Sequence, residues 1–340
     1  MHIMDIGIDL GTANIIITRR RHGVVLNEPS VIAFNKRTER VVAVGEEAYK
    51  MEGRSPSYIA VVHPLQDGVI SDDILTQALI RELIDVVAGA HIIRPRIVIC
   101  VPSLITDVEK RAILDAAMST GSRKVHLIQE PLAALLGAGI AINRPVGNMV
   151  VDIGGGTTDV AVVSMNGIVT ARSLKTAGNK FDQSIIRYVQ NKYQILLGPK
   201  SAEQVKISLC NLYNPGEERI AQVKGRNISR GLPDQCDLSE AELFEALEDD
   251  INEIGETIRR VLEETPPELV GDICQSGILL TGGGALLGGL EPYLTRVLGV
   301  PCRTAKDPLT CVARGTEQAF RRRDVLLDGF ERIDNYTQAG

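Results

Sequence analysis

Two stretches of the sequence follow one plan: Ile8-Asp9-Leu10-Gly11-Thr12 and Val151-Asp152-Ile153-Gly154-Gly155-Gly156-Thr157. In each, an apolar run reaches an aspartate, a glycine turn and a hydroxyl residue follow, and a second apolar run begins. Short β-rich runs alternate with helical stretches along the chain, which predicts an α/β architecture. Because the two copies lie about 140 residues apart, the repeat predicts two similar domains that face each other.

Both turns have the composition of a phosphate-binding site. Glycine lets the backbone approach a phosphate closely, and successive N–H groups in such a turn bind anions. Thr12, Thr157 and Thr158 would add hydroxyl donors. Asp9 and Asp152 repel phosphate, but they fit a site in which Mg²⁺ and its waters lie between the carboxylates and the phosphates. The alternative, a pair of ordinary hairpin turns, is disfavoured by the match between the copies.

A third glycine cluster, Thr281-Gly282-Gly283-Gly284, lies between an apolar run at 277–280 and residues 285–290, where we expect a helix to begin. It offers a flat backbone surface for a nucleotide base or ribose; the alternative is a tight strand-to-helix turn. The chain has no G-x-x-x-x-G-K-[ST] sequence, so it is not a P-loop protein. Asp159 and Leu287 occupy the last position of G-x-G-x-x-G in the two triple-glycine clusters, which disfavours a dinucleotide fold.

Glu130 is the candidate catalytic residue. It follows the apolar run at 125–128, and Pro131 after it suits the first turn of a helix. A carboxylate at this place could orient or deprotonate a water that attacks a γ-phosphate. The alternative is a charge that interacts favourably with the helix dipole.

The composition indicates a cytoplasmic protein with a large core. The 340 residues are 44% hydrophobic, which suits two domains, and the net charge of −6 gives no reason to expect a nucleic-acid partner. The first residues lack the pattern of a secretory signal, and no apolar run approaches the roughly 20 residues that span a bilayer. The six cysteines are scattered, so we expect reduced thiols in a cytoplasm.

Local signals predict individual elements. The continuous apolar run at 97–101 predicts a buried strand, whereas Asn27-Glu28-Pro29 is expected to break the β pattern. Thr106-Asp107-Val108-Glu109 and Ser239-Glu240-Ala241-Glu242 have capping-box spacing, so a helix is expected after each.

Taken together, the motifs resemble a known family. The sequences at 9–14, 152–159 and 281–284 are similar to the phosphate-1, phosphate-2 and adenosine motifs of the actin, sugar-kinase and chaperone superfamily. Longer stretches narrow the resemblance to MreB and its close paralogues, the bacterial actin-like rod-shape-determining family. These stretches are Leu26-Asn27-Glu28-Pro29-Ser30-Val31, Asp67-Gly68-Val69-Ile70, Gly147-Asn148-Met149-Val150-Val151-Asp152 and Thr265-Pro266-Pro267-Glu268-Leu269.

The resemblance implies an actin-like ATPase fold of two similar domains, each with a smaller subdomain, and a nucleotide in the cleft between them. Residues 1–145 and 315–328 would form domain I, with its subdomain at about 33–65. Residues 146–314 would form domain II, with its subdomain at about 181–244. Residues 329–340 are interpreted as a polar tail outside the family core.

The resemblance also assigns roles to residues. Asp9 and Asp152 would hold hydrated Mg²⁺, and Glu130 would position the catalytic water. Gln129 departs from the second acid that many relatives have there, and Asp159 replaces a frequent Glu. The residues that would contact ATP are Thr12, Ala13, Asn14, Gly154, Gly155, Gly156, Thr157, Thr158, Glu203, Lys206, Gly282, Gly283, Gly284 and Ala285.

The implied function is that of a cytoskeletal filament. The protein would bind ATP, hydrolyse it slowly in step with polymerisation, and have no separate metabolic substrate. Its partners would be copies of itself, the inner face of the cytoplasmic membrane and membrane proteins of cell-wall elongation. Through them the filament would organise cell-wall synthesis and rod shape. Ile92 and Ile93, in an expected loop, are the candidate membrane contacts because loops seldom expose two isoleucines; alternatively, they begin the buried strand.

Three other functions on this fold are considered. A small-molecule or sugar kinase would need a further carboxylate facing a hydroxyl substrate and insertions that build a pocket, and we find no such insertion. A chaperone-type ATPase would need a peptide-binding domain, whereas about 25 residues follow Gly315. An ATP-binding scaffold that does not polymerise stays open, because filament contacts carry no motif.

Overall fold

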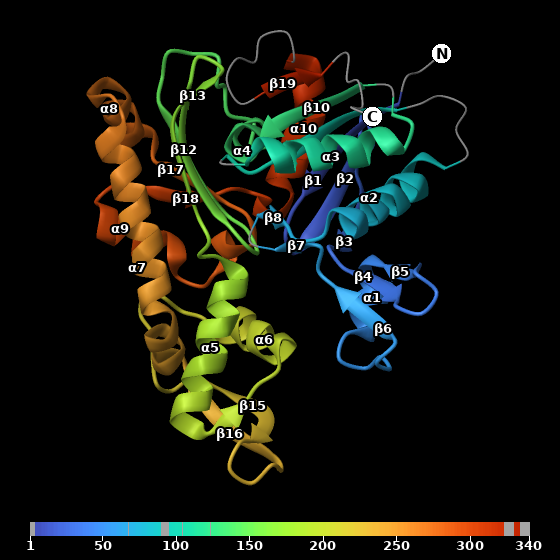
Figure 1. Cartoon of the computed structure of the whole chain (residues 1–340). Coiled ribbons are helices and arrows are strands. Elements are labelled where there is room, and N and C mark those ends of the chain that lie inside the picture. The colour runs from blue at the N-terminus through green and yellow to red at the C-terminus, as the bar shows by residue number, and fades with distance from the viewer. Residues whose placement is uncertain are drawn as a thin grey trace.

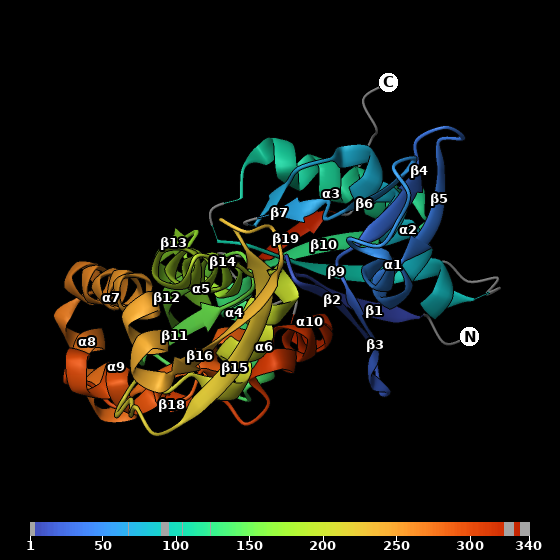
Figure 2. The same cartoon turned by 90° about the horizontal axis from the view of Figure 1, so that it is seen from below.

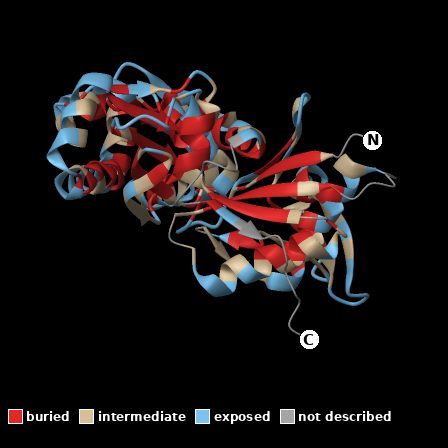
Figure 3. Ribbon diagram, turned by 90° about the horizontal axis from the view of Figure 1, so that it is seen from above, coloured by how far each residue is buried: buried red, intermediate tan, exposed pale blue. Residues whose placement is uncertain are grey.

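The structure is a computed structural model that describes residues 4–66, 68–89, 95–103, 105–122, 124–322 and 330–333. Two large sheets with their helices form the upper part of Figure 1, and two smaller lobes lie below them. Seen from above, most strands of both large sheets are buried (Figure 3). No helix in these described ranges is long and apolar enough to cross a membrane.

The first large sheet contains, in spatial order, β19 (Phe330–Ile333), β10 (Lys124–Gln129), β9 (Arg96–Val101), β1 (Asp5–Leu10), β2 (Asn14–Arg19) and β3 (Gly23–Pro29). Alternate residues of β9 face different layers. Ile97, Ile99 and Val101 pack with α2 (Asp73–Ala88) and α3 (Asp107–Ser119). Val98 and Cys100 pack with α4 (Glu130–Gly137) and α10 (Cys311–Arg322). Because both faces are covered, β9 is apolar from Ile97 to Val101, and the expected buried strand is confirmed.

The second large sheet repeats this plan with β13 (Gly167–Leu174), β12 (Thr158–Ser164), β11 (Asn148–Ile153), β17 (Ile278–Thr281) and β18 (Cys302–Thr304). β11 pairs antiparallel with β12 and parallel with β17, as β1 does with β2 and β9. Asp152 lies in register with Thr281, and Asp9 with Cys100. The predicted repeat is therefore confirmed, and the two aspartates occupy equivalent positions. The helices α7 (Glu240–Glu264), α8 (Pro267–Ser276) and α9 (Leu290–Leu298) contribute to this core.

Each large sheet carries one smaller lobe. The first lobe has the strands β5 (Arg40–Val44), β4 (Ile32–Asn35) and β6 (Ile59–Val62), with α1 (Gly45–Met51) against them. A short hairpin, β7 (Leu65–Gln66) and β8 (Val69–Ile70), leads from it to α2. The second lobe has β14 (Ile195–Leu196), β15 (Ile220–Asn227) and β16 (Pro233–Ser239), together with α5 (Gly178–Tyr193) and α6 (Pro199–Leu209).

The helices α4 and α10 join the two halves. α4 contacts β9 and β10 on one side and β11 and β12 on the other, while α10 contacts α4, β1 and β9. A Cβ on Gly315 would lie 1.8 Å from the carbonyl oxygen of Ala133, so the helices cross this closely only because residue 315 is glycine. One hydrophobic cluster contains residues of both sheets and both helices. The two halves therefore share a core, which lies in the upper part of Figure 1.

The structure confirms both predicted capping boxes and contradicts the predicted break in the β pattern. Both capping boxes are confirmed, Thr106 with Glu109 at α3 and Ser239 with Glu242 at α7. The expected break at 27–29 is wrong, because β3 continues to Pro29, which pairs with Asn14. β3 is an edge strand, where a proline is tolerated because its missing N–H leaves no partner unsatisfied.

Two further expectations are met only in part. The α-helix expected to begin at 285–290 starts at the last of these residues: a 3-10 turn, η1 (Gly283–Leu286), comes first, and α9 starts at Leu290. Gly288-Gly289 lies between them, and glycine disfavours helix. The polar tail at 329–340 is also not wholly irregular, because Phe330–Ile333 forms β19 on β10. Phe330 is buried there, although most residues of the tail are polar.

Candidate functional site

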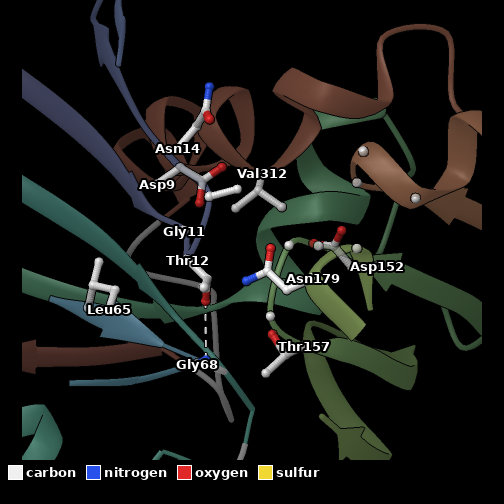
Figure 4. Close-up of a pocket in the computed structure, with 18 of the residues that line it drawn as sticks. Asp9, Gly11, Thr12, Asn14, Leu65, Gly68, Asp152, Thr157, Asn179 and Val312 are labelled. Carbon is white, nitrogen blue, oxygen red and sulfur yellow. Dashed lines mark hydrogen bonds between the residues drawn. The ribbon is translucent and has the colours of Figure 1, made fainter. Parts of the chain in front are cut away.

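A cavity of about 520 Å³ lies between the two halves, at the ends of the central strands β1 and β11. Its walls come from both glycine turns, from β17 and η1, and from α5 and α6. In Figure 4, Asp9 and Thr12 approach from one half, and Asp152 and Thr157 from the other. The volume lies within the range of pockets that bury small ligands. The cavity therefore joins segments that are far apart in the sequence.

The first turn is fixed by hydrogen bonds within its own half of the molecule. Ser30 donates from its hydroxyl to the carbonyl of Gly11 at 2.6 Å and from its amide to the carbonyl of Ala13 at 2.9 Å. The Thr12 hydroxyl accepts a bond from the Gly68 amide at 3.2 Å (Figure 4). These contacts hold the turn rigidly against the cavity.

The second turn is held by the start of α5. The carbonyls of Gly154 and Gly155 accept bonds from the amides of Gly178 and Asn179, at 3.1 and 2.7 Å. Within the described part of the chain, the amides of Gly155 and Gly156 donate no hydrogen bond. These amides remain available to an anion. A Cβ on Gly155 would lie 2.7 Å from the Cβ of Ala13, so the two turns meet and residue 155 must be glycine.

Four carboxyl groups share this end of the cavity. Burial raises the pKa of Asp9 to about 7. Burial also raises the pKa of Asp152 well above its ordinary value, and the charges of Asp9 and Asp159 add to the effect. The pKa of Glu130 is likewise raised well above its ordinary value. Burial is the largest cause, and the charges of the three aspartates follow. Burial and mutual repulsion thus oppose the ionisation of all four carboxyl groups, and a bound cation would favour it.

Asp159 is the partner of Glu130. It accepts hydrogen bonds from the Ser103 amide at 3.0 Å and the Ser173 hydroxyl at 3.3 Å. Burial raises the pKa of Asp159, while the bonds from Ser103, Glu130 and Ser173 lower it. A protonated Glu130 donates to a carboxylate that two further donors hold in place. Asp159 therefore fixes the direction in which the Glu130 carboxyl points.

The carboxyl groups fit a hydrated divalent cation. Surplus buried negative charge favours a cation, and carboxylate oxygens are the ligands that Mg²⁺ takes from proteins. Within the described residues, no group of three or more His, Cys, Asp or Glu is arranged to hold a metal ion directly. A cation at Asp9 and Asp152 would then keep much of its water.

The opposite end of the cavity is built by α5 and α6. The Lys206 ammonium lies 2.8 Å from a carboxylate oxygen of Asp182 and donates to the Gly178 carbonyl at 3.1 Å. Lys206 therefore forms an ion pair with Asp182. Glu203 is exposed and also lines the cavity. Nothing local in the sequence connects Asp182 with Lys206, which lies 24 positions further on.

Three apolar side chains line the cavity and remain exposed. Ile207 is 74% exposed, and Leu286 and Leu309 are each 56% exposed. A single exposed apolar side chain is common and does not indicate a binding site. Three that converge on one cavity form a surface for an apolar, flat group such as a nucleotide base. The sequence analysis missed all three, because each lies in a different segment.

Most of the predicted site residues line the cavity. They are Asp9, Thr12, Ala13, Asn14, Glu130, Asp152, Gly154, Gly155, Gly156, Thr157, Glu203, Lys206, Gly282, Gly283 and Gly284. Thr158 does not, because residues alternate along β12 and its buried hydroxyl donates to the Thr176 carbonyl at 2.6 Å. Ala285 does not either, because η1 turns it into the core. Ile92 and Ile93 lie outside the described residues.

The family profile described as MreB/Mbl protein matches residues 3–327. The chain belongs to the MreB/Mbl family. Within this family of cell-shape-determining, actin-like proteins, the chain is 44% identical to the "Cell shape-determining protein Mbl" of Bacillus subtilis (strain 168), over 98% of each chain. The sequence resemblance to MreB and its paralogues is thereby confirmed.

Solved structures place the chain in the actin-like fold. MreB5 of Spiroplasma citri bound to ADP superposes with a TM-score of 0.90 and 38% identity, covering 94% of this MreB/Mbl-family chain and 97% of the other. The same protein bound to AMPPNP gives 0.87 and 36%, covering 95% and 98%. The MamK double helical filament gives 0.80 and 25%, covering 94% and 99%. The predicted fold class is confirmed.

Proposed function

We propose that this protein binds Mg²⁺-ATP in the cleft, hydrolyses it slowly and assembles with copies of itself into filaments. The observation that carries the proposal is the cavity, in which two glycine turns, a carboxyl cluster and apolar walls converge. Titles of two related structures name ADP and AMPPNP as ligands of MreB5, and a third names a MamK filament. Relatives of this chain therefore support both the nucleotide and the assembly.

The chain supplies distinct groups to each part of the nucleotide. The free amides of the second turn and the hydroxyls of Thr12 and Thr157 would hold phosphates. The apolar side chains beside Glu203 and Lys206 would hold the adenosine. Mg²⁺, kept by Asp9 and Asp152 through water, would neutralise the charge of the phosphates.

Glu130 would act on the attacking water. Its carboxyl lies at the start of α4 and is fixed by Asp159. Once bound cationic charge has offset the neighbouring carboxylates, Glu130 can lose its proton and accept one from water. This assignment makes the protein a slow ATPase with no separate metabolic substrate.

The proposal extends to the domain limits and the location. Domain I would comprise residues 1–145 and 315–328, and domain II residues 146–314. Ile92 and Ile93 would contact the inner face of the cytoplasmic membrane, where filaments would meet membrane proteins of cell-wall elongation and influence cell shape. The lack of a basic surplus in the net charge of −6 supports a function without nucleic acid.

Sedimentation and electron microscopy of the purified protein, with and without Mg²⁺-ATP, test this function. We expect pelleted filaments only with the nucleotide, and no ATP turnover by Asp152→Asn with an unchanged circular dichroism spectrum. If calorimetry detects no binding of Mg²⁺-ATP to the wild type, the assignment of the cavity is wrong. If ATP binds and no filament forms, the protein is a scaffold or a kinase on the same fold.

A further inference from the structure

A single lysine connects the two smaller lobes across the mouth of the cleft. Lys200 lies in the first turn of α6, in the second lobe. Its ammonium donates to the Tyr49 carbonyl at 2.8 Å, lies 3.5 Å from the centroid of the Tyr49 ring, and is 3.6 Å from a Glu52 carboxylate oxygen. Tyr49 lies in α1 and Glu52 caps its end, in the first lobe. The lobes face each other in the lower part of Figure 1 and in the view from below (Figure 2).

This contact has no substitute in the described residues. Between residues 31–66 and 178–239, every hydrogen bond, ion pair and ring contact that the described ranges contain is made by Lys200. The second oxygen of Glu52 is held by the His63 ring at 2.9 Å, which directs the first toward Lys200. In the described residues, the polar and ring contacts between the two lobes therefore depend on one side chain.

The first lobe is attached at both ends of α1. At its start, the Glu46 amide donates to a Glu28 carboxylate oxygen at 2.7 Å, and Glu28 belongs to β3 of the large sheet. At its end, the Tyr49 carbonyl accepts the bond from Lys200. A cation at the end of a helix also interacts favourably with the helix dipole. α1 thus ties domain I to the second lobe when this bond is made.

The same helix that carries Lys200 also lines the cavity. Glu203 and Lys206 follow at three-residue steps, so the three side chains lie along neighbouring turns of α6. After burial, the charge of Glu203 is the largest contribution to a raised pKa of Tyr49, which puts the ring near the cavity wall. The contact between Lys200 and α1 therefore lies one helical turn from Glu203, which lines the cavity.

We propose that Lys200 is a latch, which holds α1 against α6 and slows the release and entry of nucleotide. The inference rests on the proposed binding of nucleotide in the cleft. It assigns to Lys200 control of the exchange rate rather than of the chemical step. Lys200 and Glu52 are half-exposed, with side chains 42% and 37% accessible, so the contact is weak enough to open reversibly.

The latch can be tested by the rate at which the protein releases the fluorescent analogue mant-ADP. Release is followed in a stopped-flow instrument after excess ADP is added. Lys200→Met keeps the length of the side chain and removes its charge, and we expect release about three- to fivefold faster, the scale of one exposed ion pair with a cation–π contact. Lys200→Arg keeps the charge and should retain slow release. Lys224→Met, an exposed lysine on β15 in the same lobe, is the matched control and should release at the wild-type rate.

A double-mutant cycle tests whether Glu52 acts through the same contact. Glu52→Gln should speed release less than Lys200→Met does, and the double variant should match Lys200→Met. The proposal would be overturned if Lys200→Met released mant-ADP at the wild-type rate, or if Lys224→Met accelerated release as much as Lys200→Met does.

Hydrogen exchange of the nucleotide-free protein separates the latch from the proposed function. The amides of α1 should exchange faster in Lys200→Met than in the wild type. This result supports the latch even if mant-ADP fails to bind, in which case only the nucleotide site is lost. Unchanged exchange in α1 would show that Lys200 does not hold the lobes together.

Discussion

Replacing Lys206 by methionine tests the electrostatic account of the α5 and α6 wall. Lys206 and Asp182 form an ion pair at 2.8 Å, and their side chains are only 10% and 14% exposed. Methionine preserves most of the apolar stem but leaves the Asp182 carboxylate without its cation. Removing one partner of a buried pair costs about 3–5 kcal/mol. Because some solvent reaches both groups, we expect the lower end, about 3 kcal/mol, at pH 8.

The loss should depend on pH in a defined direction. Burial raises the pKa of Asp182 from 3.8 to about 6, in spite of the attraction to Lys206. The folded state therefore binds this proton more tightly than the unfolded state does, and wild-type stability falls as the pH rises from about 4 to about 6. In Lys206→Met the pKa is higher still, so stability continues to fall above pH 6. At pH 5 the carboxyl is mostly protonated, and the loss should shrink to about 1 kcal/mol.

Urea unfolding of the nucleotide-free protein, followed by circular dichroism at pH 5 and pH 8, measures both quantities. Lys192→Met is the matched control, because Lys192 lies 2.8 Å from Glu242 but is 46% exposed. It should change the free energy of unfolding by less than about 1 kcal/mol at either pH. Equal losses for the two variants at pH 8, or a Lys206→Met loss that does not shrink at pH 5, would refute the reasoning.

Two further predictions concern the chemistry and the membrane. Glu130→Gln should bind mant-ATP normally but release phosphate roughly 10²-fold more slowly, as expected when a general base is lost; an unchanged rate would leave Glu130 as a helix-terminal charge. Asp159→Asn, which weakens the hold on Glu130, should slow release about tenfold without altering affinity. Ile92→Ser with Ile93→Ser should remove about 3–6 kcal/mol of apolar burial per subunit and abolish co-sedimentation of filaments with anionic liposomes; equal binding by wild type and variant would exclude this loop from the membrane.

Local patterns in the sequence were sufficient to predict the strand–turn–strand repeat, the buried strand β9 and both capped helices. Each of these depends on residues within a few positions of one another, because hydrogen bonding and side-chain alternation in strands and helices are local. The match to family motifs then indicated the fold and most of the cavity lining. Local patterns misjudged Thr158, whose direction depends on the pairing of β12, and Phe330, which is apolar inside a polar segment.

The tertiary structure alone decided which charges meet. Lys206 pairs with Asp182 rather than with Glu203, although Glu203 is its neighbour on α6. Lys200 reaches Tyr49 across 151 positions of the sequence. Contacts of this kind leave no periodic signal, because either partner alone resembles an ordinary charged residue on a solvated helix face. The packing of α5 against α6 brings Asp182 to Lys206, whereas the folding of both halves onto the shared core of α4 and α10 brings Lys200 to Tyr49. Packing gives each of these charges a specific partner, and burial raises the pKa of Asp182 to about 6.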